Sequence, residues 1–339
     1  MKNILVTGGA GFIGSNFVRY MLNKYKNYNI INYDKLTYAG NIRNLVGVDK
    51  YKNYKFIKAD ICNYKKLDDT FKSEKIDNVI HFAAESHVDK SILDPFSFVK
   101  TNVLGTLNLL EVSRKNWKND YNGKLFHHIS TDEVFGSADD GLFFNEKTPY
   151  DPHSPYSASK ASSDHFVRAY FDTYDLPVKI SNCSNNYGPF QFPEKFIPLI
   201  INNIINKKEL PIYGDGQNIR DWIHVYDHAD ALDLIFHKGL IGETYLVGAN
   251  EQRKNIEIVN IITNFADVLL QRDNGSSKDL IRFVEDRPGH DKRYAIDTKK
   301  IYSQLGWKPK INLKNGIKKT IEWYIENKKW IDYSLKKNI

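Results

Sequence analysis

The chain has 339 residues, with 48 Lys or Arg against 41 Asp or Glu and a formal net charge of +7. Its length allows one large domain or two, and 41% hydrophobic with 26% charged residues excludes a disordered or collagen-like chain. No apolar run approaches the ~18 residues of a membrane helix, and the run at 4–6 is too short for a signal peptide. We therefore expect a cytoplasmic protein that contacts no membrane.

The basic excess and the two cysteines each allow more than one interpretation. The positive charge could bind nucleic acid or an anionic small molecule. No block of about five like charges occurs, however, which favours a solvated surface. Cys62 and Cys183 predict reduced thiols, and without a nearby histidine cluster they predict no metal site.

Strands alternate with helices in the first half of the chain, which is typical of a parallel sheet covered by helices. We expect strands at 3–7, 29–33, 54–59, 78–82, 125–130 and 178–182, and helices at 12–25, 102–113 and 158–174. Beyond residue 182 we expect short strands at 211–214, 218–225 and 244–247 between helices at 196–206, 227–237 and 313–325. The fold class is therefore α/β, with a Rossmann-type doubly wound parallel sheet at 1–182. A smaller mixed α/β domain, interleaved with the first, follows at 183–339.

A glycine-rich loop joins the first expected strand to the first helix. Glycines at 8, 11 and 14 allow a sharp turn, close approach of a pyrophosphate and tight packing of the helix on the sheet. Asp34 ends the second strand, about 20 residues beyond the last glycine, where an acid accepts the ribose 2′-hydroxyl. The loop therefore predicts a dinucleotide site that prefers NAD to NADP.

Two further motifs carry candidate chemistry. Tyr156 and Lys160 are four residues apart at a helix start, so they share one face, and a neighbouring ammonium would favour the phenolate. Thr131, Asp132 and Glu133 follow the fifth strand at the carboxyl edge of the sheet. Two adjacent acids in a dry cleft leave one protonated beside one ionised, which suits an elimination. Both can serve one substrate only if the strand ends before them.

These residues resemble the extended short-chain dehydrogenase/reductase family over nearly the whole chain, and within it the nucleotide-sugar 4,6-dehydratases. The matching segments are 7–14, 34–41, 81–89, 130–136, 155–161, 182–189, 193–195 and 286–291. The glycine loop and the Tyr-x3-Lys spacing are typical of the superfamily, whereas the Thr-Asp-Glu run and the segments 34–41 and 286–291 are more specific.

The resemblance implies a redox-neutral dehydration of dTDP-D-glucose to dTDP-4-keto-6-deoxy-D-glucose by a homodimer that retains NAD. Tyr156 would take the proton of the sugar 4-hydroxyl while hydride leaves C4, with Thr131 bonded to O4 and Lys160 to the nicotinamide ribose. Glu133 would then remove the C5 proton as Asp132 protonates the departing 6-hydroxyl.

Three sets of binding residues complete the prediction. Those assigned to the cofactor are Gly8, Gly11, Phe12, Ile13, Gly14, Asp34, Lys35, Leu36, Thr37, Asp60, Ile61, Phe82, Ala83, Ala84, Thr101, Tyr156, Lys160 and Asn186. By the resemblance, those assigned to the sugar are Ser86, Thr131 and Asn185. Those assigned to thymidine diphosphate are Lys195, Phe196, Pro211, Tyr213, Arg220, Asn255, Arg287 and His290.

Three alternatives remain open at this point. The first is a 4-epimerase or a dehydratase acting on a UDP- or GDP-sugar, which would share the fold and the Tyr-x3-Lys spacing. The second is an NAD-binding regulator without catalysis, because a cofactor fold does not guarantee chemistry. The third, a nucleic-acid binder, is suggested only by the charge, and we expect no nucleic-acid partner.

Overall fold

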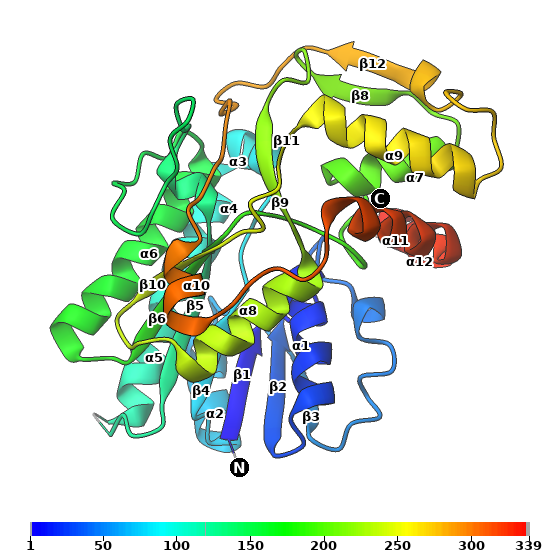
Figure 1. Cartoon of the computed structure of the whole chain (residues 1–339). Helices are drawn as coiled ribbons and strands as arrows, with labels where there is room; N and C mark the ends of the chain where they lie inside the picture. The colour runs from blue at the N-terminus through cyan, green and yellow to red at the C-terminus, as the bar shows by residue number, and fades with distance from the viewer. Residues whose placement is uncertain (1, 119, 337–339) are drawn as a thin grey trace.

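A seven-stranded parallel sheet forms the centre of the computed structural model, which describes residues 2–118 and 120–336 (Figure 1). Its strands are β1 (Lys2–Thr7), β2 (Tyr28–Asp34), β3 (Tyr54–Lys58), β4 (Asn78–His81), β5 (Leu125–Thr131), β6 (Val178–Cys183) and β10 (Thr244–Val247). The spatial order is β10-β6-β5-β4-β1-β2-β3, and each neighbouring pair is parallel. The doubly wound sheet is confirmed, and its strand order reverses between β1 and β4, where such sheets bind ligands.

The last strand of this sheet comes from the second half of the chain. The sequence pattern groups 244–247 with the short strands of the second half, but Tyr245 pairs with Ser181 of β6 in the large sheet. Four consecutive buried residues in β10 explain the placement, because a strand between two layers of helices is apolar on both faces.

Helices cover both faces of the sheet (Figure 1). One face carries α1 (Phe12–Lys24) and α8 (Val225–Lys238); the other carries α2 (Tyr64–Glu74), α5 (Gly105–Trp117) and α6 (Pro155–Tyr174). Phe17 and Met21 of α1, one turn apart, are fully buried in the same core as Leu232 of α8. Burying a side chain of this size stabilises the fold by about 1.5–3 kcal/mol, so the two helices are fixed on the sheet.

The helix that carries Tyr156 begins three residues earlier than its apolar spacing predicts. Ser154 is the N-cap: its hydroxyl accepts the Ser157 N–H at 3.1 Å, and the Ser157 hydroxyl accepts the Ser154 N–H at 3.0 Å. Pro155 occupies the first helical position, where a missing N–H costs nothing. Tyr156 therefore lies in the first turn of α6.

The expected helix at 102–113 is irregular at its start. Two short helices, α3 (Val88–Leu93) and α4 (Pro95–Phe98), precede a π-helical stretch, η2 (Val99–Leu104), and only then does α5 begin. The wider π turn places the Asn102 side chain against the backbone of Glu85, whose N–H and carbonyl it bonds at 2.8 and 3.0 Å. This contact fixes the loop after β4.

A smaller lobe lies over the carboxyl edge of the large sheet (Figure 1). It holds a sheet of β7 (Asn185–Tyr187), β9 (Ile219–His224) and β11 (Gln252–Lys254), and a parallel pair, β8 (Leu210–Tyr213) and β12 (Ile281–Val284). Its helices are α7 (Phe196–Ile205), α9 (Asn255–Leu269), α11 (Leu313–Glu326) and α12 (Lys328–Lys336). Its apolar core includes Ile200, Ile258 and Ile317, one from each of three helices.

Two segments tie the lobes together. Trp330 of α12 donates from Nε1 to the Asn44 side-chain oxygen at 2.8 Å, and Asn41 donates to the Ser334 hydroxyl at 2.8 Å. The strap after β12 runs down to α10 (Lys299–Leu305) and bonds the loop after β5, where the Ala138 N–H donates to the Arg293 carbonyl at 2.9 Å. These contacts set the width of the cleft between the lobes.

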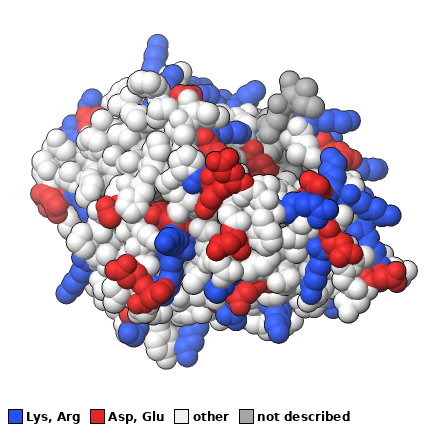
Figure 2. Space-filling model, turned by 90° about the horizontal axis from the view of Figure 1, so that it is seen from above, with Lys and Arg blue, Asp and Glu red and all other residues white. Residues whose placement is uncertain are grey.

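The described residues have the hydropathy and the spread of charges of a folded protein surface. None of their helices is long and apolar enough to cross a membrane. On the face in Figure 2, Lys and Arg side chains spread around the rim and alternate with Asp and Glu.

Candidate active site

The glycine loop lies at the carboxyl edge of the sheet, beside the reversal of strand order. Gly8 has a φ of +69°, and a Cβ on it would come within 2.6 Å of the Ala83 backbone nitrogen. A Cβ on Gly14 would come within 2.3 Å of the Gly8 carbonyl oxygen. Gly11 caps α1 without a side-chain hydrogen bond, so the helix N-terminus faces the cleft with its positive dipole end. This cradle fits a dinucleotide pyrophosphate.

Asp34 ends β2 beside the glycine loop and lines the same cleft, which has a volume of about 320 Å³. Its carboxylate accepts the Ala10 N–H at 2.9 Å and the Leu36 N–H at 2.7 Å. These bonds fix the carboxylate at the end of β2, where an acid can accept a ribose hydroxyl. The acid and the glycine loop together fit NAD.

The two adjacent acids both reach the cleft because β5 stops before them. Residues Asp132–Phe135 form a 3₁₀ turn, η3, and the Thr131 hydroxyl accepts the Glu133 N–H at 3.2 Å. Consecutive residues of a strand would point to opposite faces. Because the strand ends before Asp132, both acids can reach one substrate, as the sequence required.

The surroundings of the two acids differ in charge. Burial, and then the charge of Glu133, raises the pKa of Asp132 well above its usual range. Burial also raises the pKa of Glu133, but Arg287, Arg220 and Lys195 oppose that rise. Asp132 therefore holds its proton more firmly, which suits a general acid, and Glu133 ionises more readily, which suits a general base.

Tyr156 and Lys160 lie one turn apart on α6 and both line the cleft. We expected the Lys160 ammonium to lower the pKa of Tyr156, but burial, followed by the charge of Glu133, raises it well above its usual range. The Lys160 ammonium does not offset this rise, because it is directed elsewhere: Lys160 Nζ donates to the Ile129 carbonyl at 2.9 Å and lies 3.4 Å from His128 Nε2. The residues of the chain alone thus keep the phenol protonated.

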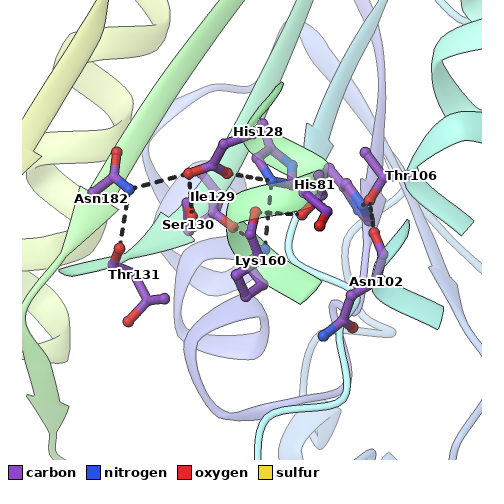
Figure 3. Close-up of polar contacts among 12 residues, drawn as sticks. His81, Asn102, Thr106, His128, Ile129, Ser130, Thr131, Lys160 and Asn182 are labelled. Atoms are coloured by element: carbon purple, nitrogen blue, oxygen red, sulfur yellow. Dashed lines mark hydrogen bonds and ion pairs between the residues drawn. The ribbon is translucent and has the colours of Figure 1, made fainter. Parts of the chain in front are cut away.

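Buried polar side chains connect the strands behind this site (Figure 3). The His81 ring bonds the Thr7 hydroxyl at 2.7 Å and the Thr106 hydroxyl at 2.9 Å, joining β1, β4 and α5. Asn182 on β6 donates to the Thr131 carbonyl at 3.0 Å, immediately before the acids. Such hydrogen bonds between buried side chains fix side-chain and backbone positions in a core.

Cationic side chains gather on the small-lobe side of the cleft. Lys195 Nζ donates to the Ser86 carbonyl at 2.9 Å, and Arg220 donates to the Asp291 carbonyl at 2.8 Å. Arg287 pairs with Asp89 at 3.2 Å. All three cations act to lower the pKa of Glu133, so they lie near the two acids. There they can bind an anionic part of a ligand.

The structure brings most of the predicted residues to one cleft. The five predicted catalytic residues line it, as do the predicted cofactor residues other than Leu36. Leu36 instead packs against the core between the sheet and α1. Of the predicted sugar and diphosphate residues, the cleft is lined by Ser86, Thr131, Asn185 and Lys195.

The other diphosphate candidates lie in the small lobe or the strap, outside this lining. Phe196 stacks on Trp222 at 6.0 Å, and the Tyr213 ring meets the His290 ring edge-on at 6.2 Å. Asn255 is the first residue of α9, and Pro211 lies in β8 with Tyr213. The structure therefore does not bring Arg220, Arg287, Tyr213 and His290 into the lining of the cleft, and their assignment to the nucleotide stays a prediction.

Several residues of the cleft were not predicted. They include Tyr33, Glu85, Ser130, Cys183, Ser184, Gln191 and Phe192. Glu85 precedes Ser86, and Cys183 ends β6 at the carboxyl edge, so position relative to a strand end could have indicated both. Gln191 and Phe192 carry no such signal, because they lie in a loop whose path depends on the small lobe.

Comparisons with known proteins agree with this geometry. The chain matches the family model described as GDP-mannose 4,6 dehydratase over residues 5–320. A relative from Sinorhizobium fredii, named probable dTDP-glucose 4,6-dehydratase, is 54% identical over 96% of this chain and 94% of its own length.

Solved structures are similar over the same extent. The dTDP-glucose 4,6-dehydratase from Bacillus anthracis, in complex with NAD, has a TM-score of 0.88 at 44% identity, covering 98% of this chain and 100% of that one. The dTDP-glucose 4,6-dehydratase from Streptomyces venezuelae, with NAD and TYD bound, has a TM-score of 0.90 at 42% identity, covering 98% and 99%.

Proposed function

The chain belongs to the GDP-mannose 4,6-dehydratase family, and from that premise we propose that it dehydrates dTDP-D-glucose to dTDP-4-keto-6-deoxy-D-glucose with NAD as its cofactor. One observation carries the proposal. Asp132 and Glu133, whose pKa values burial raises, share one cleft with Tyr156 and a dinucleotide cradle. A 4-epimerase needs no acid–base pair for an elimination, so the pair favours the dehydratase.

The first half of the reaction needs a base at the sugar 4-hydroxyl. The bound cofactor would accept hydride from C4 as NAD⁺ and return it to C6 as NADH. Tyr156 takes the 4-hydroxyl proton, with the Thr131 hydroxyl beside it and a hydrogen bond from Thr131 favouring the phenolate. Because burial opposes that phenolate, a positive charge bound in the cleft has to offset the cost.

The second half is an elimination across C5 and C6. The new 4-ketone acidifies the C5 proton, and Glu133 removes it. Asp132 gives its own proton to the 6-hydroxyl, which leaves as water. After hydride reaches C6, the proton on Glu133 returns to C5 and completes the 6-deoxy product. The opposite charge surroundings of the two acids support this division of roles.

We assign the nucleotide part of the substrate to the small-lobe side. Arg220, Arg287 and Lys195 supply charge for a diphosphate, and Tyr213 and His290 supply ring faces and edges for the base. In this assignment residues 1–182 bind the cofactor, and residues 183–339 mainly bind the nucleotide sugar.

We also propose that the enzyme is a cytoplasmic homodimer. Leu93 and Phe96, in α3 and α4, are 85% and 82% exposed, and Val99 and Leu104 continue this apolar surface along η2. An apolar surface beside α5 and α6 fits a contact in which these helices pack against a second copy. Two free cysteines suit a reducing compartment.

A direct incubation tests the function. The purified enzyme with dTDP-glucose should form a 4-keto-6-deoxy product, identified by mass loss of one water and by its ketone. Tyr156→Phe should lose turnover by at least about a hundredfold while still binding NAD. An absence of product with NAD bound, or faster conversion of UDP-glucose than of dTDP-glucose, would contradict the assignment.

A further inference from the structure

Behind the cleft, on the side of α6 that faces β5, lies a carboxylate that takes no part in the chemistry above. Asp164 is fully buried, one turn beyond Lys160 on the same helix. Its Oδ2 accepts the Ser130 hydroxyl at 2.8 Å and the Tyr150 hydroxyl at 2.9 Å. A buried carboxylate costs several kcal/mol of solvation free energy unless it is bonded or paired, so these partners keep it ionised.

The imidazole of His128 lies between this carboxylate and the Lys160 ammonium. Its Nε2 is 3.1 Å from Asp164 Oδ1 and 3.4 Å from Lys160 Nζ. Burial, and then the charge of Lys160, lowers the pKa of His128 to about 4, so the ring is neutral near pH 7. The negative charge of Asp164 therefore faces the ammonium across an uncharged ring.

Lys160 needs such a countercharge. Burial alone lowers its pKa, and Asp164 is the strongest group acting in the opposite direction, followed by Cys183. The titratable groups around the ammonium are His128 on β5, His81 on β4, Cys183 at the end of β6, and Tyr156 and Asp164 on α6. Burial raises the pKa of Cys183 to about 12, so its thiol is neutral. Asp164 is thus the anion among them.

We infer that Asp164 is a positioning residue for the proposed reaction, a fixed negative charge behind the cleft that keeps the Lys160 ammonium charged and directed at the Ile129 carbonyl beside Tyr156. The inference rests on the proposed function for its kinetic consequence, but its effect on Lys160 does not depend on turnover. A charged Lys160 keeps its ammonium donors for the Ile129 carbonyl and for a ribose hydroxyl of the cofactor.

The test uses Asp164→Asn, which keeps the shape and an acceptor oxygen for Ser130 and Tyr150 but removes the charge. The matched control is Tyr150→Phe, which removes a hydrogen bond to the same carboxylate and leaves the charge. In Asp164→Asn we expect the alkaline limb of the kcat/KM profile to move to lower pH by about one unit. On that limb kcat/KM should therefore fall about tenfold. The control should keep the wild-type limb.

A second readout is independent of turnover. Calorimetric titration of NAD into cofactor-free protein should show wild-type affinity for Asp164→Asn near pH 6 and a loss of about tenfold near pH 9. If Asp164→Asn shows this loss of NAD affinity near pH 9 but the wild-type protein converts no nucleotide sugar, the proposed function fails and the role of Asp164 stands.

Unchanged pH dependence in both readouts, with only a lower Tm, would overturn the inference and leave Asp164 a structural residue. Asp164→Ser removes the same charge with a smaller side chain and should give the same shift, which guards against a steric effect of asparagine. If neither variant folds while Tyr150→Phe does, the carboxylate serves folding and the inference is overturned.

Discussion

At the scale of single residues, the acid pair depends on charges contributed by distant parts of the chain. Burial raises the pKa of Glu133, and Arg287 is the group that opposes this rise most strongly. Removing that charge with Arg287→Gln should raise the pKa further. Because Glu133 acts as a base, the acid limb of the kcat/KM profile should move to higher pH, by about half a unit to one unit.

Arg282→Gln is the control for that change, because it removes the same charge from an exposed side chain paired with Glu209. Its profile should match that of the wild type. A parallel shift in both variants would assign the effect to net charge, and no shift in Arg287→Gln would show that the guanidinium does not act on the base.

Much of the site could be predicted from short sequence motifs. The glycines, Asp34, the acid pair and the Tyr156–Lys160 spacing could be found because each motif is local in the sequence. Asp164 could not, because a lone acid in a helix is indistinguishable from a surface residue until the packing of β5 against α6 is known. Arg220 and Arg287 were identified by resemblance and not from their own sequence context.

At the scale of elements, the first turn of α6 connects a helix cap with the catalytic tyrosine. Ser154→Ala removes the hydroxyl that accepts the Ser157 N–H and should lower the free energy of unfolding by about 1 kcal/mol, as loss of an N-cap does. Because Tyr156 lies in that turn, kcat should fall while KM changes little. Urea unfolding and steady-state kinetics measure the two effects.

Ser162→Ala is the comparison within the same helix. Its hydroxyl bonds only the Ala158 carbonyl, so the substitution should change stability by no more than about 0.5 kcal/mol. Equal stability losses in both variants would mean that the cap adds nothing beyond a generic serine bond.

Most strands of the large sheet and six of the helices were predicted from their apolar patterns, but α2 and α12 were not, although each has one buried face. Strands β1 to β6 follow from short apolar runs between turns. Helix α9 was missed because its many Ile, Val and Thr residues favour strands locally, whereas Ile258, Ile262 and Ala266 lie on one buried helical face. The π turn at 99–104 was missed because its register is set by Asn102 bonding the Glu85 backbone.

At the scale of the whole molecule, the exposed apolar surface on α3, α4 and η2 predicts an assembly. Phe96→Asp should convert the proposed dimer to a monomer at micromolar concentration, because it places a charge at the centre of an apolar contact. Light scattering on a sizing column gives the mass. Val268→Asp, on the exposed side of α9, should leave the mass unchanged. A wild-type monomer would contradict the prediction outright.

The position of β10 also bears on how the molecule is made. Six strands of the large sheet are complete at residue 183, but the seventh lies at Thr244–Val247, beyond most of β7 to β9 and α7 to α8. At about 5–20 residues per second, a ribosome needs roughly 3–12 seconds to reach it. During that interval the outer edge of β6 has open N–H and C=O groups, which can pair with another nascent chain. Translation speed between these strands therefore influences the yield of correctly folded enzyme.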